Sequence, residues 1–416
     1  MRFIHIGDLH FGKMFYKTSL VEADQPYWVD QLLRAVDEYD VDAVVIAGDV
    51  YDRKDPSIEA MRLVDHMLTE LALRGKYVFI IPGNHDSEGR LSYNHELLSS
   101  HKIFIAGRVE RELKHITITG SGTPVTFWLM PYIFPKLVAD EKVLNNPDIT
   151  TYDAAARELI KAQNIDTNSC NVLIAHQNVL ANGKAPEHSD SETIIGGVGE
   201  IEVSAFDAFD YVALGHIHNA QRIGRETARY SGCPLYYDFS EVNREKNLTL
   251  VTINSKDDID IQSIEIPLLH KMEQFTGTLD ELIEEGNKLT DKNAYHIQCI
   301  ITDKHIPTGA LDRLRDVFGE SLINVTRGRS AQGSSEESSE RLGKIDSLSL
   351  DEQFSRFYQE QAQDLLDDDQ EHVVEMILEQ QIKNGDSYAY DAKSVDNGDS
   401  QEILDYLIRA VGKETV

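Results

Sequence analysis

Residues 1–10 read MRFIHIGDLH, an apolar stretch that ends in a glycine, an aspartate and a histidine. Two further stretches have the same plan, AVVIAGDVYD at 43–52 and YVFIIPGNHD at 77–86. Short runs rich in valine, isoleucine and phenylalanine are typical of buried strands. The segments 27–40 and 56–74 between them are amphipathic and indicate helices. This alternation predicts an α/β fold in which polar residues follow the strands.

Further strands are expected along the first 270 residues, and the last two form an antiparallel pair across a polar turn. These strands are 125–130, 171–175, 211–214, 247–254 and 260–266. A smaller set of elements follows, which we interpret as an accessory domain too small to be stable without packing against a neighbour. It comprises helices 278–289 and 308–318 and strands 295–302 and 322–327.

Length and charge limit the classes of function. A chain of 416 residues corresponds to two to three domains at roughly 150 residues each. The 40 basic and 71 acidic residues give a net charge of −31, which argues against a generally basic surface for nucleic acid. A phosphate-rich substrate therefore needs a local positive site. The three cysteines have no paired spacing and no apolar run approaches about 20 residues, so we expect a cytoplasmic protein without disulfides or membrane spans.

The composition changes after residue 330. Residues 331–345, AQGSSEESSERLGKI, lack apolar periodicity and indicate a flexible linker. Residues 331–416 hold 7 basic and 21 acidic residues, a net charge of −14. In the acidic tail at 346–416, four apolar residues recur at helical spacing and suit docking onto a partner helix, or packing on the chain's own domain. They are Leu350, Phe354, Phe357 and Tyr358.

Side chains suited to metal ions follow five of the expected strands. In an α/β sheet the functional site lies beyond the carboxyl ends of the strands, so these residues should meet there. The candidate ligands are Asp8, His10, Asp49, Asn84, His176, His216 and His218. Their oxygen and nitrogen atoms suffice for two divalent cations if one carboxylate is shared. Each strand end alone is a weak signal, since a single histidine can be an ordinary hydrogen-bonded imidazole, but the five together predict a metal site.

The order of these motifs, Asp-x-His, Gly-Asp-x-x-Asp, Gly-Asn-His-Asp, His and Gly-His-x-His, resembles that of the calcineurin-like metallophosphoesterases. Within that superfamily the sequence is most similar to the SbcD-type nuclease subunits of DNA repair. The likeness lies within residues 1–245 and rests on IGDLHFGK, AGDVYDRKDPS, PGNHDS, HSDSETIIGGVGEIEVSAFDAFDYVALGHIHNAQ and YSGCPLYYDFSE.

The resemblance implies a fold of two stacked mixed sheets flanked by helices, followed by a small α/β capping domain and a helical C-terminal tail. We therefore expect a nuclease domain at 1–270 and a DNA-binding capping domain at 271–330. The linker at 331–345 then leads to a partner-docking tail at 346–416.

The resemblance also implies how the ligands divide between two metal ions. One ion is expected at Asp8, His10, Asp49 and His218, and the other at Asp49, Asn84, His176 and His216. Asp49 would then bridge the ions. Two divalent ions carry four positive charges and the two aspartates remove two, so about two remain to hold a phosphodiester. Imidazole-rich ligation favours two Mn²⁺, with Fe²⁺ or Mg²⁺ as alternatives, because Mg²⁺ prefers oxygen ligands.

Two residues beside the ligands are candidates for catalysis. His85 follows Asn84 and would contact the phosphate and protonate or stabilise the leaving 3′ oxygen, although it could instead only shape the turn. Asp52 lies three residues after Asp49, and its carboxylate could reach His85 and favour the imidazolium. Some relatives carry a histidine at this place, which leaves the role of Asp52 open.

These features predict a Mn²⁺-dependent DNA nuclease subunit that hydrolyses phosphodiesters by a two-metal mechanism. The resemblance implies 3′ to 5′ exonuclease action on double-stranded ends and endonuclease action on single strands and hairpins. The sequence has no Gly-x-x-x-x-Gly-Lys-Ser/Thr motif, and the resemblance implies an SbcC-type coiled-coil ATPase partner and a homodimer within a heterotetramer. The alternatives are a small-molecule phosphodiesterase or phosphatase on the same metal centre, and a non-enzymatic subunit that positions an ATPase on DNA.

Overall fold

The structure, a computed structural model, describes residues 1–119, 123–189, 191–192 and 199–328. The expected linker at 331–345 and the expected tail at 346–416, with Leu350, Phe354, Phe357 and Tyr358, lie outside the described residues. Among the described helices, none combines the length and the apolar character needed to cross a membrane.

The first sheet has six strands in the order β16-β15-β1-β4-β5-β6. Strands β1, β4, β5 and β6 run parallel, and β15 pairs antiparallel with β1 and β16. The bounds are β1 (Arg2–Ile6), β4 (Ala43–Ala47), β5 (Tyr77–Ile81), β6 (Ile103–Ile105), β15 (Asn247–Ser255) and β16 (Asp258–Glu265). Every residue of β4 is buried, as expected for an unbroken apolar run inside a parallel sheet.

The second sheet also has six strands, in the order β13-β14-β12-β9-β8-β7. Its four central strands run parallel, and the edge strands β13 and β7 are antiparallel to their neighbours. The bounds are β7 (Lys114–Ile118), β8 (Val125–Met130), β9 (Cys170–His176), β12 (Tyr211–Gly215), β13 (Gln221–Ile223) and β14 (Arg225–Tyr230).

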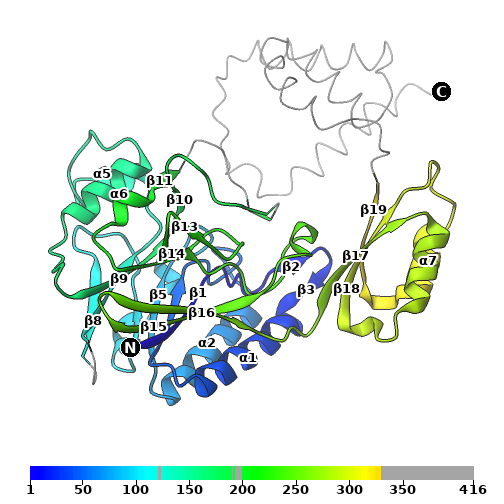
Figure 1. The fold of residues 1–416 in the computed structure, drawn as a ribbon, viewed down its shortest axis with the longest axis horizontal. Coiled ribbons are helices and arrows are strands. Elements are labelled where there is room, and N and C mark those ends of the chain that lie inside the picture. Colours follow the sequence, from blue (N-terminus) through cyan, green and yellow to red (C-terminus); the bar gives the residue numbers. More distant parts are fainter. Residues whose placement is uncertain (120–122, 190, 193–198, 329–416) are drawn as a thin grey trace, which may run out of the picture. The chain divides into compact units, whose positions relative to one another are not determined.

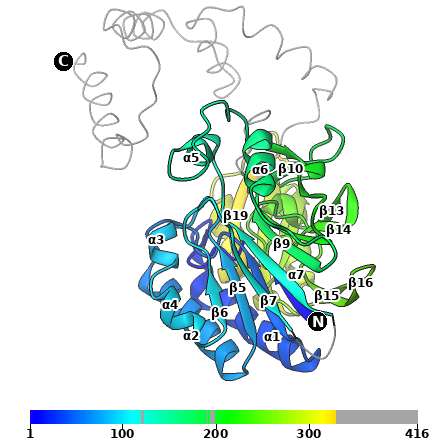
Figure 2. The same ribbon diagram turned by 90° about the vertical axis from the view of Figure 1, so that its left-hand side faces the viewer.

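The two sheets pack face to face around a shared apolar core. Phe79 of the first sheet stacks on Phe127 of the second with 4.3 Å between ring centroids, and Phe3 meets Phe127 edge-on at 5.5 Å. Helices α1 (Asp24–Glu38) and α2 (Ile58–Leu73) pack on the outer face of the first sheet. Helices α5 (Pro135–Ala139) and α6 (Tyr152–Lys161) lie on the side of the second sheet (Figures 1 and 2). The predicted fold class of stacked mixed sheets flanked by helices is confirmed.

Short elements connect these layers. They are β2 (Met14–Phe15), β3 (Thr18–Ser19), α3 (Glu88–Leu91), α4 (His95–Ser99), β10 (Asn178–Leu180) and β11 (Glu200–Glu202). The 3-10 helices are η1 (Leu20–Glu22), η2 (Val203–Phe206), η3 (Phe239–Glu241), η4 (Lys292–Ala294) and η5 (Gly319–Ser321). β2 and β3 form a hairpin, and α3 and α4 follow the end of β5.

A third sheet, whose strands are all parallel, follows β16 along the chain. Its strand order is β17-β18-β19 (Figure 1). Its elements are β17 (Lys271–Gly277), α7 (Leu279–Lys288), β18 (Tyr295–Ile301), α8 (Ala310–Phe318) and β19 (Leu322–Arg327). Thr278 and Glu281 form a capping box at the start of α7, which satisfies two main-chain N–H groups there. Leu282, Ile297 and Phe318 belong to its core. The expected helices and strands are present, while the division of the chain into the four predicted segments stays a prediction.

Candidate metal centre

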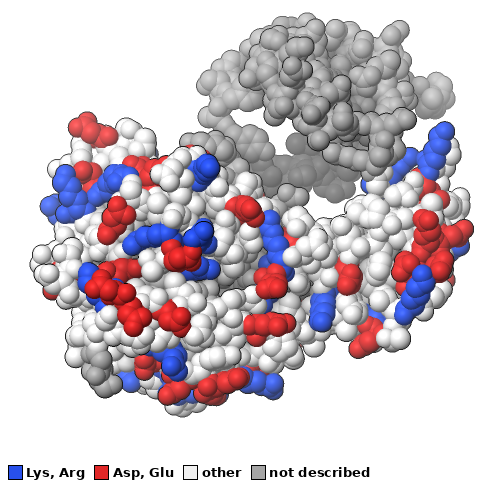
Figure 3. All heavy atoms as spheres, in the orientation of Figure 1, with Lys and Arg blue, Asp and Glu red and all other residues white. Residues whose placement is uncertain are grey.

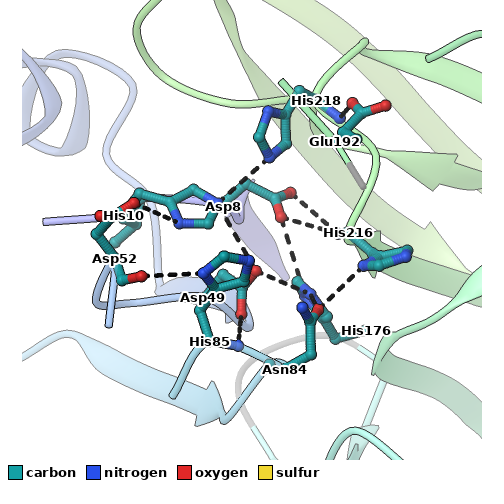
Figure 4. Close-up of polar contacts among 12 residues, drawn as sticks. Asp8, His10, Asp49, Asp52, Asn84, His85, His176, Glu192, His216 and His218 are labelled. Carbon is teal, nitrogen blue, oxygen red and sulfur yellow. Dashed lines mark hydrogen bonds and ion pairs between the residues drawn. The ribbon is translucent and has the colours of Figure 1, made fainter. Parts of the chain in front are cut away.

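The seven candidate ligands meet at the carboxyl ends of five strands (Figure 4). Asp8 and His10 follow β1, Asp49 follows β4, and Asn84 follows β5, which are neighbours in the first sheet. The other three come from adjacent strands of the second sheet: His176 ends β9, and His216 and His218 follow β12. Because the two sheets are stacked, their strand ends supply ligands from both sides of one site.

The backbone at these strand ends is unusual. Four of the candidate ligands have a positive φ, namely Asp8 at 53°, His10 at 42°, Asp49 at 48° and His216 at 101°. Residues other than glycine rarely adopt such values, which cost about 1–3 kcal/mol each and are found mainly where function requires them. The backbone is therefore strained at these four residues, and in this conformation their side chains turn toward one another.

The first group consists of Asp8, His10 and His218, all of them buried. His10 Nε2 lies 3.3 Å from His218 Nε2 and 3.6 Å from Asp49 Oδ2. His218 Nδ1 contacts Ser191 Oγ at 2.7 Å, and that hydroxyl donates to a carboxylate, so Nδ1 must carry the proton. Nε2 faces His10, an arrangement that suits a cation between the two imidazoles.

The second group consists of Asp8, Asp49 and His176, with Asn84 and His216 beside it. His176 Nδ1 lies 2.8 Å from the Ala47 carbonyl oxygen, which can only accept, so this nitrogen carries the proton. His176 Nε2 lies 3.3 Å from Asp49 Oδ2 and 3.1 Å from Asn84 Oδ1, and on losing its proton it would offer a lone pair to an ion held between these oxygens. Asn84 Oδ1 also lies 3.1 Å from His216 Nδ1. Several lone pairs converge on one small volume, which fits a divalent cation.

Asp49 lies between the two groups. The same oxygen, Oδ2, is 3.6 Å from His10 Nε2 and 3.3 Å from His176 Nε2, while Oδ1 accepts a hydrogen bond from the His85 main-chain N–H at 2.9 Å. This is the position that a bridging carboxylate would occupy.

Charge within the site is unevenly distributed. Burial would raise the pKa of Asp49, but the imidazoles of His176 and His10 outweigh burial and lower it. For Asp8 burial prevails over the nearby His176 and raises the pKa to about 6. Burial opposes a charge on His176, yet Asp49 outweighs it and raises the pKa to about 9, whereas burial lowers the pKa of His216 to about 3. The excess of carboxylate charge thus attracts a positive charge to the centre of the site.

The expected contact between Asp52 and His85 is made by a different atom. His85 Nδ1 donates to the main-chain carbonyl of Asp52 at 2.9 Å. The Asp52 carboxylate instead accepts from Lys13 Nζ at 3.0 Å and lies 3.6 Å from His10 Nδ1. The main-chain carbonyl of Asp52 therefore orients the His85 ring, and because an Asp52 carboxylate oxygen also lies within 4.8 Å of a His85 ring nitrogen, the effect of that carboxylate on the imidazolium stays a prediction.

Asp86 has a role that sequence reasoning did not assign. Its buried carboxylate accepts hydrogen bonds from the main-chain N–H groups of Val50, Tyr51 and Gly83 at 2.9–3.1 Å. Burial, reinforced by the charge of Asp49, raises the pKa of Asp86 to about 6. Asp86 thereby ties the end of β4 to the end of β5. As the last residue of Gly-Asn-His-Asp it could have been suspected from the motif.

A second support holds His218. Ser191 Oγ links His218 Nδ1 to Glu241 Oε1, at 2.7 Å and 2.8 Å, and the Glu192 carboxylate accepts from the His218 main-chain N–H (Figure 4). Glu241 is fully buried and pairs with Lys246 Nζ at 2.7 Å. These residues lie outside the strand ends, and although Ser191, Glu192 and Glu241 fall within motifs of the family resemblance, sequence reasoning assigned them no role.

Comparison with known proteins places the chain in a family. A family model described as calcineurin-like phosphoesterase matches residues 1–220, more than half of the chain. The chain belongs to the calcineurin-like phosphoesterases, a class of metal-dependent enzymes, as the resemblance predicted. A second model, described as the type 5 capsule protein repressor C-terminal domain, matches residues 269–362. Over 387 residues the chain is 29% identical to a Staphylococcus epidermidis protein named as the SbcD subunit of the nuclease SbcCD, and the match covers 92% of this chain and 100% of that protein.

Two solved structures match more weakly. A crystal structure from Thermus thermophilus is 10% identical and covers 63% of this chain and 98% of its own, with a TM-score of 0.37. Yfce, a phosphoesterase from E. coli, is 12% identical and covers 64% of this chain and 100% of its own, with a TM-score of 0.25. Likenesses of this size add nothing to the family assignment.

Proposed function

We propose that the chain is the nuclease subunit of an SbcC–SbcD-type DNA repair complex and hydrolyses DNA phosphodiesters with two divalent metal ions. The observation that carries the proposal is the convergence of seven donor side chains in two adjacent groups, which share Asp8 and are both contacted by Asp49. The relative from Staphylococcus epidermidis, which is named as part of a nuclease, supports DNA as the substrate. The proposed activities are 3′ to 5′ exonuclease action on double-stranded ends and endonuclease action on single strands and hairpins.

The proposed ligands divide around the shared carboxylate. One ion would be held by Asp8, His10, Asp49 and His218, and the other by Asp49, Asn84, His176 and His216. When bound, the ions supply positive charge that holds the phosphodiester and acidifies water. The donors include four imidazoles, which favours Mn²⁺, with Fe²⁺ or Mg²⁺ as alternatives.

His85 is proposed to assist departure of the 3′ oxygen. Its Nδ1 donates a hydrogen bond to the Asp52 carbonyl oxygen at 2.9 Å, and its side chain is exposed. Nε2 is therefore the ring nitrogen that can contact a substrate. A protonated Nε2 would hydrogen-bond the leaving oxygen and give up its proton as the P–O bond breaks.

An SbcC-type coiled-coil ATPase and a homodimer within a heterotetramer belong to the proposal. Exposed apolar side chains on α2 and in the segment from α3 to α4 support the homodimer. Met61, Leu73, Tyr93 and Leu97 are 49%, 76%, 74% and 65% exposed, and they line one largely apolar groove. Exposed apolar surface of this kind is typical of protein interfaces. We define these four residues as the α2/α4 patch.

A cytoplasmic location also remains part of the proposal. All three cysteines, Cys170, Cys233 and Cys299, are free and buried. Unpaired cysteines are typical of proteins that work in a reducing compartment.

Nucleotide release from labelled hairpin DNA with Mn²⁺, compared with hydrolysis of a bis-aryl phosphate, tests the proposal. We expect cleavage of the hairpin and its stimulation by the ATPase partner. His85→Leu should reduce cleavage roughly 100-fold or more, as loss of a general acid does, whereas His305→Leu, which removes another exposed histidine, should have no effect. Hydrolysis of the aryl ester without hairpin cleavage would favour the small-molecule phosphodiesterase, and an inert metal-loaded protein would favour a purely structural subunit.

A further inference from the structure

A second cluster of metal-binding side chains lies outside the candidate metal centre. Asp24 begins α1, His270 directly precedes β17, and His296 lies on β18. His270 Nδ1 is 2.8 Å from Asp24 Oδ1, and His296 Nε2 is 3.4 Å from Asp24 Oδ2. One ligand atom from each residue lies within 4.8 Å of the other two. The chain thus brings together three residues separated by up to 272 positions.

The surroundings of the cluster favour a bound ion over a solvated surface group. The side chains of Asp24, His296 and His270 are 6%, 12% and 23% exposed, so they are shielded but accessible. The two imidazole rings lie 4.4 Å apart between centroids and are tilted by 40°. Phe15, which is 1% exposed, packs against His296 at 5.6 Å and forms an apolar wall. Low polarity around a carboxylate and two imidazoles strengthens their attraction for a cation.

We propose that Asp24, His270 and His296 form a separate structural site for a zinc-class divalent cation, which joins α1 to the small third sheet. Two imidazole nitrogens and one carboxylate oxygen are ligands that Zn²⁺ accepts in tetrahedral sites, with water as the fourth ligand. Ca²⁺ and Mg²⁺ prefer oxygen donors and suit this set poorly. None of the three residues is a proposed ligand of the phosphoesterase centre, so the site adds to that centre.

The site would couple metal binding to the packing of two modules. Asp24 belongs to the helix layer of the large sandwich, whereas His270 and His296 belong to the third sheet and the chain entering it. A cation that binds only when the three residues are together stabilises that arrangement by mass action. The ion would add to the hydrogen bonds of Asp24 and to the apolar contacts that Met272 and Ile323 make with the core of the sandwich.

Bound zinc per chain provides the test. The full-length protein, its His270→Gln/His296→Gln variant and a matched His101→Gln/His305→Gln control, which also loses two histidines, are stripped with EDTA and dialysed against the same free Zn²⁺. The zinc retained is then measured by atomic emission. We expect the cluster variant to retain one equivalent fewer than the wild type, and the control to retain the wild-type number. The metals in the phosphoesterase centre are common to all three proteins and cancel in this comparison.

Thermal unfolding gives a second measurement on the same samples. Zn²⁺ should raise the midpoint of the wild type and of the control by several degrees more than that of the cluster variant. Equal zinc content in the wild type and the cluster variant would overturn the proposal, and so would an equal rise in midpoint. If the double variant does not fold, judged by circular dichroism, His270→Gln alone repeats the comparison at the most exposed of the three side chains.

Discussion

Gly83 shows how closely the chain packs around the candidate ligands. A Cβ atom at this position would overlap with Asp49 Oδ1 and lie 2.6 Å from the Asp49 main-chain nitrogen. A side chain there would therefore displace the carboxylate that contacts both His10 and His176. The requirement is steric, because Gly83 does not have a positive φ.

We expect Gly83→Ala to reduce phosphodiesterase activity roughly 100-fold, since a shift of about 1 Å in a reacting group has an effect of that size. Gly89→Ala is the matched control, because a Cβ at Gly89 would have nothing within 4 Å. Initial rates on a phosphodiester substrate, with circular dichroism to verify folding, give the comparison. Full activity in Gly83→Ala, or an equal loss in both variants, would contradict the steric argument.

His5 is a buried histidine with a structural role. Its Nδ1 lies 3.0 Å from the Tyr211 hydroxyl oxygen and its Nε2 lies 3.2 Å from the Leu214 carbonyl oxygen. Burial lowers the pKa of His5 to about 3, with the Leu214 carbonyl opposing the shift and Arg229 adding to it. The native ring thus stays neutral at a pH where the unfolded chain takes up a proton.

Acidification should therefore destabilise the protein through His5. Below about pH 6.5 the unfolded state binds one more proton than the native state, so stability falls by about 1.4 kcal/mol per pH unit until the pH nears the native pKa. Because other groups titrate too, the prediction concerns a difference: the free energy of unfolding of the wild type should decline more steeply with falling pH than that of His5→Gln. Urea unfolding between pH 7.5 and 5 measures both slopes. If the free energies of unfolding of the wild type and of His5→Gln fell equally with pH, His5 would not be buried as a neutral ring.

The candidate ligands could be predicted from sequence because each follows a clearly apolar strand within a few residues. The supporting contacts could not. Which atom of Asp52 hydrogen-bonds to the His85 ring depends on the path of the turn, and the sequence did not indicate the main-chain carbonyl that does so. Ser191 and Glu241 hold His218 from positions 27 and 23 residues away, and strand or helix periodicity does not indicate such a contact.

At the level of helices and strands, prediction succeeded where burial is complete. Strand β8 begins and ends at the expected residues 125–130, and β1, β4 and β5 lie within the stretches 1–10, 43–52 and 77–86, because continuous apolar runs bounded by polar or glycine residues define them. Helix α1 begins three residues before its expected start, at Asp24, whose carboxylate is bound by the distant His270. The three-residue strands β10 and β11 were not predicted, since they are too short for a periodic signal.

The ion pair between Glu241 and Lys246 joins η3 to the start of β15. Lys246 Nζ lies 2.7 Å from Glu241 Oε2, and the two side chains are 3% and 0% exposed. Burial opposes both charges, yet the attraction of Glu241 raises the pKa of Lys246, and Lys246 together with His218 lowers the pKa of Glu241. Both groups are therefore charged at neutral pH and depend on each other.

We expect Lys246→Met to reduce the free energy of unfolding by about 3–5 kcal/mol, because Glu241 would be left as an uncompensated buried charge. Adding Glu241→Gln should restore part of the loss by removing that charge. Lys288→Met, which breaks exposed ion pairs on α7, should leave stability unchanged within error. Urea denaturation at pH 7 compares the three variants. A loss in Lys246→Met no larger than that in Lys288→Met would mean that the pair contributes nothing.

The charge of the whole molecule bears on how it meets DNA. Figure 3 shows acidic and basic side chains intermingled on one face, with acidic residues gathered over α7. With a net charge of −31, the chain has little reason to attract a polyanion except at local sites. Bound metal ions would supply positive charge that attracts DNA locally, and so would a basic partner. Both sources agree with the proposed nuclease subunit that works inside a complex.

Self-association through the α2/α4 patch is the last property that depends on the whole molecule. Leu97 lies in α4, is 65% exposed and lines the apolar groove, so Leu97→Glu should not disturb the monomer fold. In a dimer the new carboxylate would be buried without a partner, at a cost of about 3 kcal/mol, which raises the dimer Kd roughly 100-fold. Light scattering after gel filtration should find dimers of the wild type and monomers of Leu97→Glu.

Leu311→Glu is the control, because Leu311 is also exposed but belongs to α8, away from the patch. A Leu97→Glu protein that stays dimeric would show that the chains meet elsewhere, and the exposed residues of the patch would then need another partner.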